Sequence, residues 1–311
     1  NFQFYKAEYV GGRLTRSTEL FANIMCMKLI SEILLSIVLA LGTITLPADS
    51  FVPQLLQSFG DVEYHELKAT KLERSFHIFV DLPEDYRTSG ASYPTVYLLD
   101  GGNTFPLMAA YHHYLRFGDE ALPVILVGIS YAADTFKEGN YRSTDFTAPS
   151  EERDFWGGAP VFQGILRDEL LPLIENTYRA DPTKRVIFGH SLGGQFVLYT
   201  ALTHPKLFYG HIASNPALHR NLPFFLEWQG KTDSPVNVSR LFVASGELDN
   251  ARFREPTLNW ISHWQAETAR PWILETRTLA GQTHLSAVPE SFRQGLGWVF
   301  SDTNNLELSN E

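Results

Sequence analysis

A serine held between two glycines is the residue of this chain whose surroundings best suit chemistry. Residues Gly189 to Gly193 read GHSLG, the pattern G-x-S-x-G, between an apolar run at 185–188 and a helix-like run from Gln195. The residues two before and two after the serine must be very small for so sharp a turn, which favours glycine. In a strand–turn–helix context this pattern predicts a nucleophilic Ser191. The alternative is a glycine-rich connection without chemistry.

A serine nucleophile needs an imidazole that takes its proton and a carboxylate that orients the imidazole. With this motif the chain order is serine, acid, histidine. Two histidines, His263 and His284, follow the acidic candidates Glu247 and Asp249 in the chain. His263 falls in a helix-like stretch, whereas His284 lies in a loop after an apolar run, so we expect His284 to be the general base. His190 is expected to point elsewhere on the turn, in a structural role.

Two carboxylates compete for the role of the acid. Glu247 and Asp249 both follow an apolar run at 240–244 and Gly246. We favour Asp249, because three residues beyond the glycine are enough for its side chain to turn back across the strand ends. Glu247 is the alternative acid. A serine–histidine pair that works without an acid is the third possibility.

Acyl transfer also needs N–H groups that bind the oxyanion of the tetrahedral intermediate. The Leu192 amide follows the serine directly. A second donor is expected in a loop after an earlier strand, and Gly102 lies next to Gly101 after an apolar run at 93–99. Glycine lets the backbone approach the substrate oxygen. We therefore expect the oxyanion hole to consist of the Leu192 and Gly102 amides, with Asn103 as the next choice and a plain glycine turn as the alternative.

The elements that must position these residues indicate an α/β fold. Short apolar runs separated by helix-sized stretches predict a mostly parallel central sheet with helices on both faces. The expected strands are residues 75–82 (antiparallel and near a sheet edge), 93–99, 123–129, 186–188, 210–213, 240–244 and 272–276. The expected helices are residues 161–178 (kinked at Pro172), 195–203, 257–267 and 291–300. Two polar stretches, 131–160 and 221–235, are candidate pocket walls or a lid.

Composition limits the function classes. The 311 residues carry a formal net charge of −10 without a basic run interleaved with aromatics, which argues against a nucleic-acid partner. An acidic surface also suits an anionic substrate poorly unless the pocket is locally basic. The single cysteine, Cys26, excludes an intrachain disulfide and cysteine-rich zinc sites. His112 and His113 lack further ligands at suitable spacing, so we expect no metal and no cofactor.

The first 48 residues are expected to lie outside the catalytic domain. Met27 and Lys28 precede an apolar run from Leu29 to Leu46 and a small residue, Ala48, which is the pattern of a secretory signal peptide over residues 27–48. A membrane anchor and a helix of the folded domain are the alternatives. Residues 1–26 are then a non-native or unstructured extension, and residues 49–311 the catalytic domain. This organisation predicts a secreted or periplasmic protein without stable membrane contact.

Blocks of sequence from about Glu63 to Phe300 resemble one known family. They are residues 97–101, 127–131, 142–147, 168–175, 189–194 and 283–286. Together they are similar to the putative-esterase group of α/β-hydrolases, which includes esterase D-like, feruloyl, acetyl-xylan and siderophore trilactone esterases. The resemblance implies the α/β-hydrolase fold and hydrolysis of small carboxylic esters through an acyl-enzyme on the serine, without a metal. Some members have a poorly placed or missing acid, which leaves Asp249 the least firm assignment.

The resemblance leaves the ester open. A siderophore trilactone or a feruloyl ester could react at the same site, and a non-catalytic binding protein of this fold is a further alternative. No cluster of basic residues for a triscatecholate stands out, because Arg142 and Arg220 are isolated in the sequence. The expected partner is a small-molecule ester, and the oligomeric state has no signature in the sequence.

Overall fold

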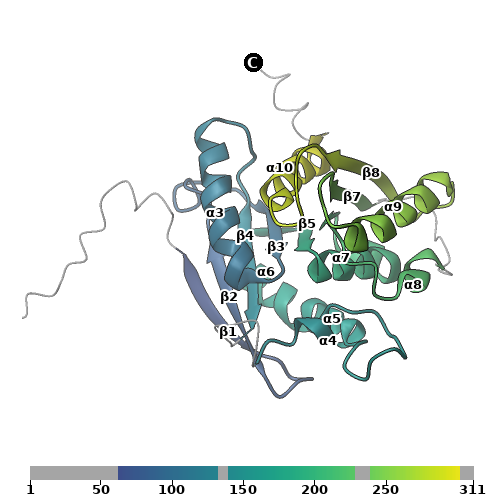
Figure 1. Ribbon diagram of the computed structural model, residues 1–311. Helices are drawn as coiled ribbons and strands as arrows, with labels where there is room; N and C mark the ends of the chain where they lie inside the picture. The colour runs from purple at the N-terminus through teal and green to yellow at the C-terminus, as the bar shows by residue number, and fades with distance from the viewer. Residues whose placement is uncertain (1–61, 132–138, 228–238, 302–311) are drawn as a thin grey trace, which may run out of the picture. The chain divides into compact units, whose positions relative to one another are not determined.

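The computed structural model describes residues 62–131, 139–227 and 239–301, and Figure 1 shows their arrangement. The predicted signal peptide at 27–48, the extension before it and Cys26 lie outside the described residues. So do parts of the two polar stretches, at 132–138 and 228–238.

One sheet of eight strands, in the order β1-β2-β4-β3-β5-β6-β7-β8, forms the centre of the described structure. The strands are β1 (Glu63–Lys68), β2 (Ser75–Asp81), β3 (Tyr93–Leu98), β4 (Ile125–Tyr131), β5 (Ala180–His190), β6 (Gly210–Ser214), β7 (Ser239–Gly246) and β8 (Trp272–Leu279). The pairs β1–β2 and β2–β4 are antiparallel, and every other pair is parallel. The mostly parallel sheet confirms the prediction. The edge strand β1 is a strand that the sequence patterns did not reveal.

Helices cover both faces of this sheet, as Figure 1 shows. The longer ones are α3 (Gly101–Phe117), α5 (Ala159–Ile165), α6 (Leu171–Thr177), α7 (Leu192–Thr203), α9 (Ala251–Ala266) and α10 (Ala287–Val299). Successive side chains of a strand point to opposite faces. Thus Val186 and Phe188 of β5 join the core beneath α3 and α10, whereas Ile187 joins the core beneath α5, α6, α7 and α9.

The predicted helix at 161–178 is three joined pieces instead of one kinked helix. A π-helical segment, η1 (Leu166–Leu170), separates α5 from α6, and Pro172 is the second residue of α6. Proline lacks an N–H and its ring clashes with the carbonyl four residues back. The wider π turns before Pro172 accommodate both effects, so the chain continues as a helix beyond the proline.

Shorter helices occupy the connections. They are α4 (Arg142–Asp145), α8 (Leu222–Leu226) and the 3-10 turn η2 (Pro205–Leu207). Among the described residues, no helix combines the length and the apolar character needed to cross a membrane.

The carboxyl ends of the parallel strands meet at one edge of the sheet, which is where ligands bind in α/β proteins. Asp100 follows β3, Ser191 follows β5, Asn215 follows β6, Asp249 follows β7 and His284 follows β8. Residues far apart in the sequence therefore reach one place because their strands run in the same direction.

Candidate active site

Ser191 occupies a strained turn between β5 and α7. Its φ of 57° and ψ of −114° are unfavourable for a residue with a side chain. A Cβ added at Gly189 would lie 2.3 Å from the Gly193 carbonyl oxygen, so the chain can close this turn only with glycine there. The Ser191 N–H donates to the Ser214 carbonyl at 3.0 Å, which ties the turn to the end of β6. The local sequence and the neighbouring strand together hold this conformation.

His284 and Asp249 form a hydrogen-bonded pair at the same edge. Nδ1 of His284 lies 2.8 Å from Oδ2 of Asp249, whose side chain is 1 % exposed. A carboxylate accepts, so Nδ1 carries the proton and Nε2 can act as a base. Glu247 is exposed and accepts from the Gly281 N–H at 2.9 Å. Of the two carboxylates considered, the structure therefore pairs Asp249 with His284.

Two helix N-termini supply the predicted oxyanion donors. Leu192 is the first residue of α7 and Gly102 the second residue of α3. N–H groups of a first turn have no intrahelical carbonyl partner, and helix N-termini carry partial positive charge, so both amides are suited to bind an oxyanion. The Asn103 N–H instead donates to the Asp100 carbonyl at 2.9 Å, which leaves Gly102 as the better second donor.

The loop that carries Gly102 is held from both sides. A Cβ at Gly101 would lie 2.5 Å from the Ile129 nitrogen, so glycine lets α3 begin directly against β4. Asp100, in the left-handed region at φ 55°, forms a two-pronged ion pair with Arg142, with Nε–Oδ1 at 2.8 Å and Nη2–Oδ2 at 2.9 Å. Bidentate pairs of this kind fix orientation as well as charge.

His190 lies beside His284, contrary to the expectation that it points elsewhere. The two ring centroids are 4.6 Å apart, and Nδ1 of His190 lies 3.2 Å from Oγ of Ser214. The reason is topological, since β5 pairs His190 with Ser214 on the side of β6, toward the His284 loop. Burial lowers the pKa of His190 to about 3, with further lowering by His284 and Arg142. The ring is therefore neutral at neutral pH and adds no positive charge beside His284.

An aromatic wall flanks His284, which the sequence patterns did not reveal. The Phe253 ring stacks on His284 with centroids 4.5 Å apart and planes 26° apart. The ring of His219 packs edge-on against Phe253, with ring centroids 4.9 Å apart. Phe253 comes from α9 and His219 from the chain after β6. The only hint in the sequence is that both stand shortly after the carboxyl ends of strands.

Near this wall, arginines that are isolated in the sequence act electrostatically on one residue, Arg220. Burial lowers the pKa of Arg220, and the charges of three other guanidinium groups lower it further: Arg142, Arg252 and Arg153. The pKa of His219 falls to about 4 through burial, then through Arg252, Arg220 and His284. The guanidinium of Arg220 lies 5.1 Å from the Trp156 ring centroid. We call Arg142, Arg153, Arg220 and Arg252 the arginine cluster. Its members come from three parts of the chain, after β4 (Arg142 and Arg153), after β6 (Arg220) and after β7 (Arg252), which is why spacing along the chain conceals it.

The histidine pair of α3 lies away from this edge and does not form a metal site. Nε2 of His112 lies 2.9 Å from the Leu122 carbonyl, whereas His113 faces Glu84 at 3.3 Å. Within the described parts of the chain, no group of three or more His, Cys, Asp or Glu side chains could hold a metal ion.

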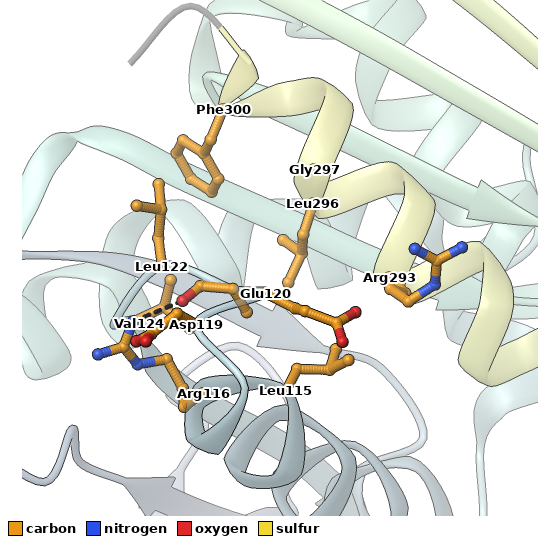
Figure 2. Close-up of a pocket in the computed structure, with 11 residues that line it drawn as sticks. Leu115, Arg116, Asp119, Glu120, Leu122, Val124, Arg293, Leu296, Gly297 and Phe300 are labelled. Carbon is orange, nitrogen blue, oxygen red and sulfur yellow. Dashed lines mark hydrogen bonds between the residues drawn. The ribbon is translucent and has the colours of Figure 1, made fainter. Parts of the chain in front are cut away.

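Figure 2 shows a cavity of about 310 Å³ between the end of α3 and the last turns of α10. Leu115, Leu122 and Phe300 line it, with Arg116 and Arg293 among its charged residues. Because α10 starts just after His284 and ends at Val299, this cavity lies toward the opposite edge of the sheet. It contains none of the predicted catalytic residues.

Comparison with known proteins points to one family. Residues 69–287 match the family described as Putative esterase. The ferri-bacillibactin esterase BesA of Bacillus subtilis is 31 % identical over 252 residues, which cover 73 % of this chain and 85 % of that protein. An apo-salmochelin esterase of Escherichia coli is 28 % identical over 52 % of this chain and 54 % of its own length. An IroE-like serine hydrolase of Shewanella oneidensis has the same fold, with a TM-score of 0.67 at 24 % identity over 78 % of this chain and 81 % of that one.

Proposed function

The chain belongs to the Putative esterase family and is a serine esterase of the α/β-hydrolase fold, and from this premise we propose that Ser191, His284 and Asp249 are its catalytic triad. The observation that carries the proposal is the 2.8 Å bond between His284 and the buried Asp249, at the same edge of the sheet where Ser191 occupies a strained strand-to-helix turn. The same constellation of roles recurs on unrelated folds, because acyl transfer requires these three functions.

The proposed reaction has two halves. Ser191 Oγ attacks the ester carbonyl while Nε2 of His284 takes its proton, and the oxyanion forms against the Leu192 and Gly102 amides. Collapse expels the alcohol, which receives the proton from His284, and leaves an acyl-enzyme on Ser191. Water, deprotonated by His284, then releases the acid. Asp249 keeps the proton on Nδ1 and stabilises the imidazolium that forms in each half.

Replacing the serine tests this mechanism. We expect Ser191→Ala to fold normally and to lose turnover of a p-nitrophenyl ester by several orders of magnitude. A fluorophosphonate probe should label the wild-type protein, and intact mass after digestion should place the label on Ser191. Turnover that survives in the folded variant would refute the proposal, and failure of the wild type to react with the probe would revive a non-catalytic binding protein.

We further propose that the substrate is an ester whose acyl part bears an aromatic ring and negative charge, as in catecholate siderophore lactones. The arginine cluster supports this, because burial and then the charges of the other three members lower the pKa of Arg220, and an anionic ligand would stabilise its charged form. The ring of Phe253 on His284, with the Trp156 ring near Arg220, offers apolar surface for an aromatic acyl group. The site is thus locally basic within an acidic protein, the condition under which an anionic substrate is compatible with the net charge of −10.

The names of the relatives agree with this substrate class, since two of them are esterases of bacillibactin and salmochelin. A feruloyl ester remains the second candidate, because its acid is aromatic but carries less negative charge. The arginines separate the two candidates: a multiply charged catecholate lactone depends on them strongly, and a feruloyl ester weakly.

An ester panel tests the substrate class. The panel contains a catecholate trilactone with and without Fe³⁺, methyl ferulate and p-nitrophenyl acetate, assayed with the wild type and with Arg220→Gln and Arg252→Gln. We expect KM for the trilactone to rise on the order of ten-fold in each variant, with little change for the acetate. Arg277→Gln, which removes an exposed arginine paired with Glu275, is the control. Equal effects on all esters would contradict the proposal.

We also propose that residues 27–48 are removed on export to the periplasm or the cell exterior. The apolar run from Leu29 to Leu46 after Lys28, followed by Ala48, supports this. N-terminal sequencing of the protein purified from its natural source should begin at Asp49, and retention of the apolar run would favour a membrane anchor.

A further inference from the structure

Asn215 is a buried polar residue that stands directly after β6 at the catalytic edge. It is 1 % exposed, and its φ of 41° lies in the left-handed region, which asparagine tolerates better than most residues. Its N–H donates to the Ala244 carbonyl at 2.8 Å, which extends the pairing with β7 by one residue. The backbone of Asn215 is therefore fixed at the end of β6, and this fixes the point from which its side chain extends.

The amide side chain of Asn215 joins the two loops that carry the acid and the histidine. Its Oδ1 accepts from the Gly246 N–H at 2.6 Å, at the end of the strand that leads to Asp249. Its Nδ2 donates to the His284 carbonyl at 2.9 Å, and the Thr283 carbonyl lies at 3.4 Å from the same nitrogen. One buried side chain thus bonds to the backbone on both sides of the His284–Asp249 pair.

The two loops are closely packed at this point. The Leu248 N–H donates to the Gln282 carbonyl at 2.8 Å. A Cβ at Gly246 would lie 2.6 Å from the Gln282 oxygen and 2.9 Å from the Thr283 oxygen. The contacts of Gly246 and Leu248 with Gln282 and Thr283 set the distance between the two loops. The His284 carbonyl itself is bonded by Asn215.

We propose that Asn215 is a positioning residue that holds the His284 loop in register with Asp249. The inference rests on the proposed triad. Asn215 bonds to the backbone carbonyl of the same residue whose ring must meet Ser191 and Asp249 together. Errors of about 1 Å in such a group can cost about a hundred-fold in rate, whereas ester binding depends on other surfaces. The effect therefore falls on kcat rather than on KM.

Two substitutions distinguish the effect of the Asn215 Nδ2 donor from an effect on folding. Asn215→Asp keeps the shape, the tolerance of positive φ and the acceptor for Gly246, but it turns an oxygen toward the His284 carbonyl in place of an N–H. Asn215→Gly suits the backbone conformation and removes both side-chain bonds without repulsion, so it carries the test if the aspartate variant does not fold. We expect each variant to lose roughly ten- to a hundred-fold in kcat on p-nitrophenyl acetate, with KM within about two-fold of wild type.

A matched control excludes a general effect of lost stability. Gln163 is a buried amide of α5 that donates to Thr203 at 3.0 Å, far in the topology from the catalytic loops. Gln163→Ala also loses a buried amide hydrogen bond, and we expect it to keep wild-type kcat below its unfolding temperature.

Proton NMR provides a readout that a merely structural role would not change. The Nδ1 proton of a histidine bonded to a carboxylate resonates far downfield, and we expect this signal in the wild type and in Gln163→Ala but weakened or absent in the Asn215 variants. Wild-type kcat in a folded Asn215 variant would overturn the inference. So would a loss of kcat that the Asn215 variants share with Gln163→Ala, if the downfield signal of the Asn215 variants is unchanged. Activity that survives in Ser191→Ala would instead refute the triad, so the two failures are distinguishable.

Discussion

Asp249 and Glu247 follow the same strand two residues apart, and their side chains have different surroundings. The Asp249 carboxylate is almost completely buried and lies against His284, while Glu247 is exposed and bonds to the Gly281 backbone. A buried carboxylate with a fixed partner can orient an imidazole and stabilise its charged form, which a solvated one does poorly.

At this scale we predict a large difference between two conservative variants. Asp249→Asn should lower kcat by on the order of 10³- to 10⁴-fold, because the amide no longer holds the proton on Nδ1 of His284. Glu247→Gln should change kcat by less than about three-fold, since its side chain bonds to a backbone N–H of the loop instead of the ring. Steady-state kinetics on one ester measures both, and equal, small losses would instead support a serine–histidine pair.

Whole elements bring these residues into place. The strands β5 and β3 each lead into a helix at the catalytic edge, so that α7 and α3 present first-turn N–H groups where the proposed mechanism develops negative charge. The helix α10, which covers the same face of the sheet as α3, begins three residues after His284 and packs on β6 through Gly295. The close approach of α10 to the sheet thus sets where the His284 loop ends.

Substitutions at two glycines of α10 distinguish the effect of this packing from the effect of helix propensity. A Cβ at Gly295 would lie 2.6 Å from Ile212, whereas one at Gly297 meets nothing within 4 Å. We expect Gly295→Ala to lower the free energy of unfolding by about 1–3 kcal/mol through overpacking. In the same helix, Gly297→Ala should raise it by up to about 1 kcal/mol, because alanine is the better helix former. Denaturant unfolding of both variants measures the difference, and destabilisation by both alike would contradict the packing argument.

For the molecule as a whole, the distribution of charge matters more than its sum. The protein is acidic, yet the charges of three arginines act on a fourth, Arg220, beside the catalytic edge. Several histidines are also buried in neutral form, and burial is the largest cause of their lowered pKa values: about 4 for His112, about 3 for His190 and about 3 for His211. The same core that places the site therefore links stability to pH.

Acid should destabilise the fold through these histidines. His211 has a pKa of about 3 in the folded protein, compared with the ordinary histidine value of 6.5. Between pH 6.5 and about pH 3, the unfolded chain therefore binds a proton at this residue that the folded chain does not. The contribution of His211 to stability is complete above pH 6.5 and is lost as the pH falls through this window. For His211→Gln we expect the slope of unfolding free energy against pH, between pH 6 and 4, to fall by roughly 1.4 kcal/mol per pH unit. Urea unfolding across this range measures the slope, and a slope equal to wild type would show that His211 is protonated in the fold.

Some features could be predicted from the sequence because their causes are local. The sharp turn at Ser191 depends on the sterics of five consecutive residues, and continuous apolar runs indicate buried parallel strands wherever they occur. The order of serine, acid and histidine then restricted the base to a choice between His263 and His284. The fold class and the family follow from these features, and the structure and the comparisons confirm them.

Other features were decided by the tertiary structure alone, because they depend on contacts between distant residues. His284 and Asp249 are 35 residues apart, and Asn215 and His284 are 69 residues apart, so no spacing in the sequence relates them. The pairing of His284 with Asp249, the arginine cluster and the position of His190 all arise where parallel strands end together. Local sterics determine how each segment folds, whereas the alignment of strand ends determines which side chains meet.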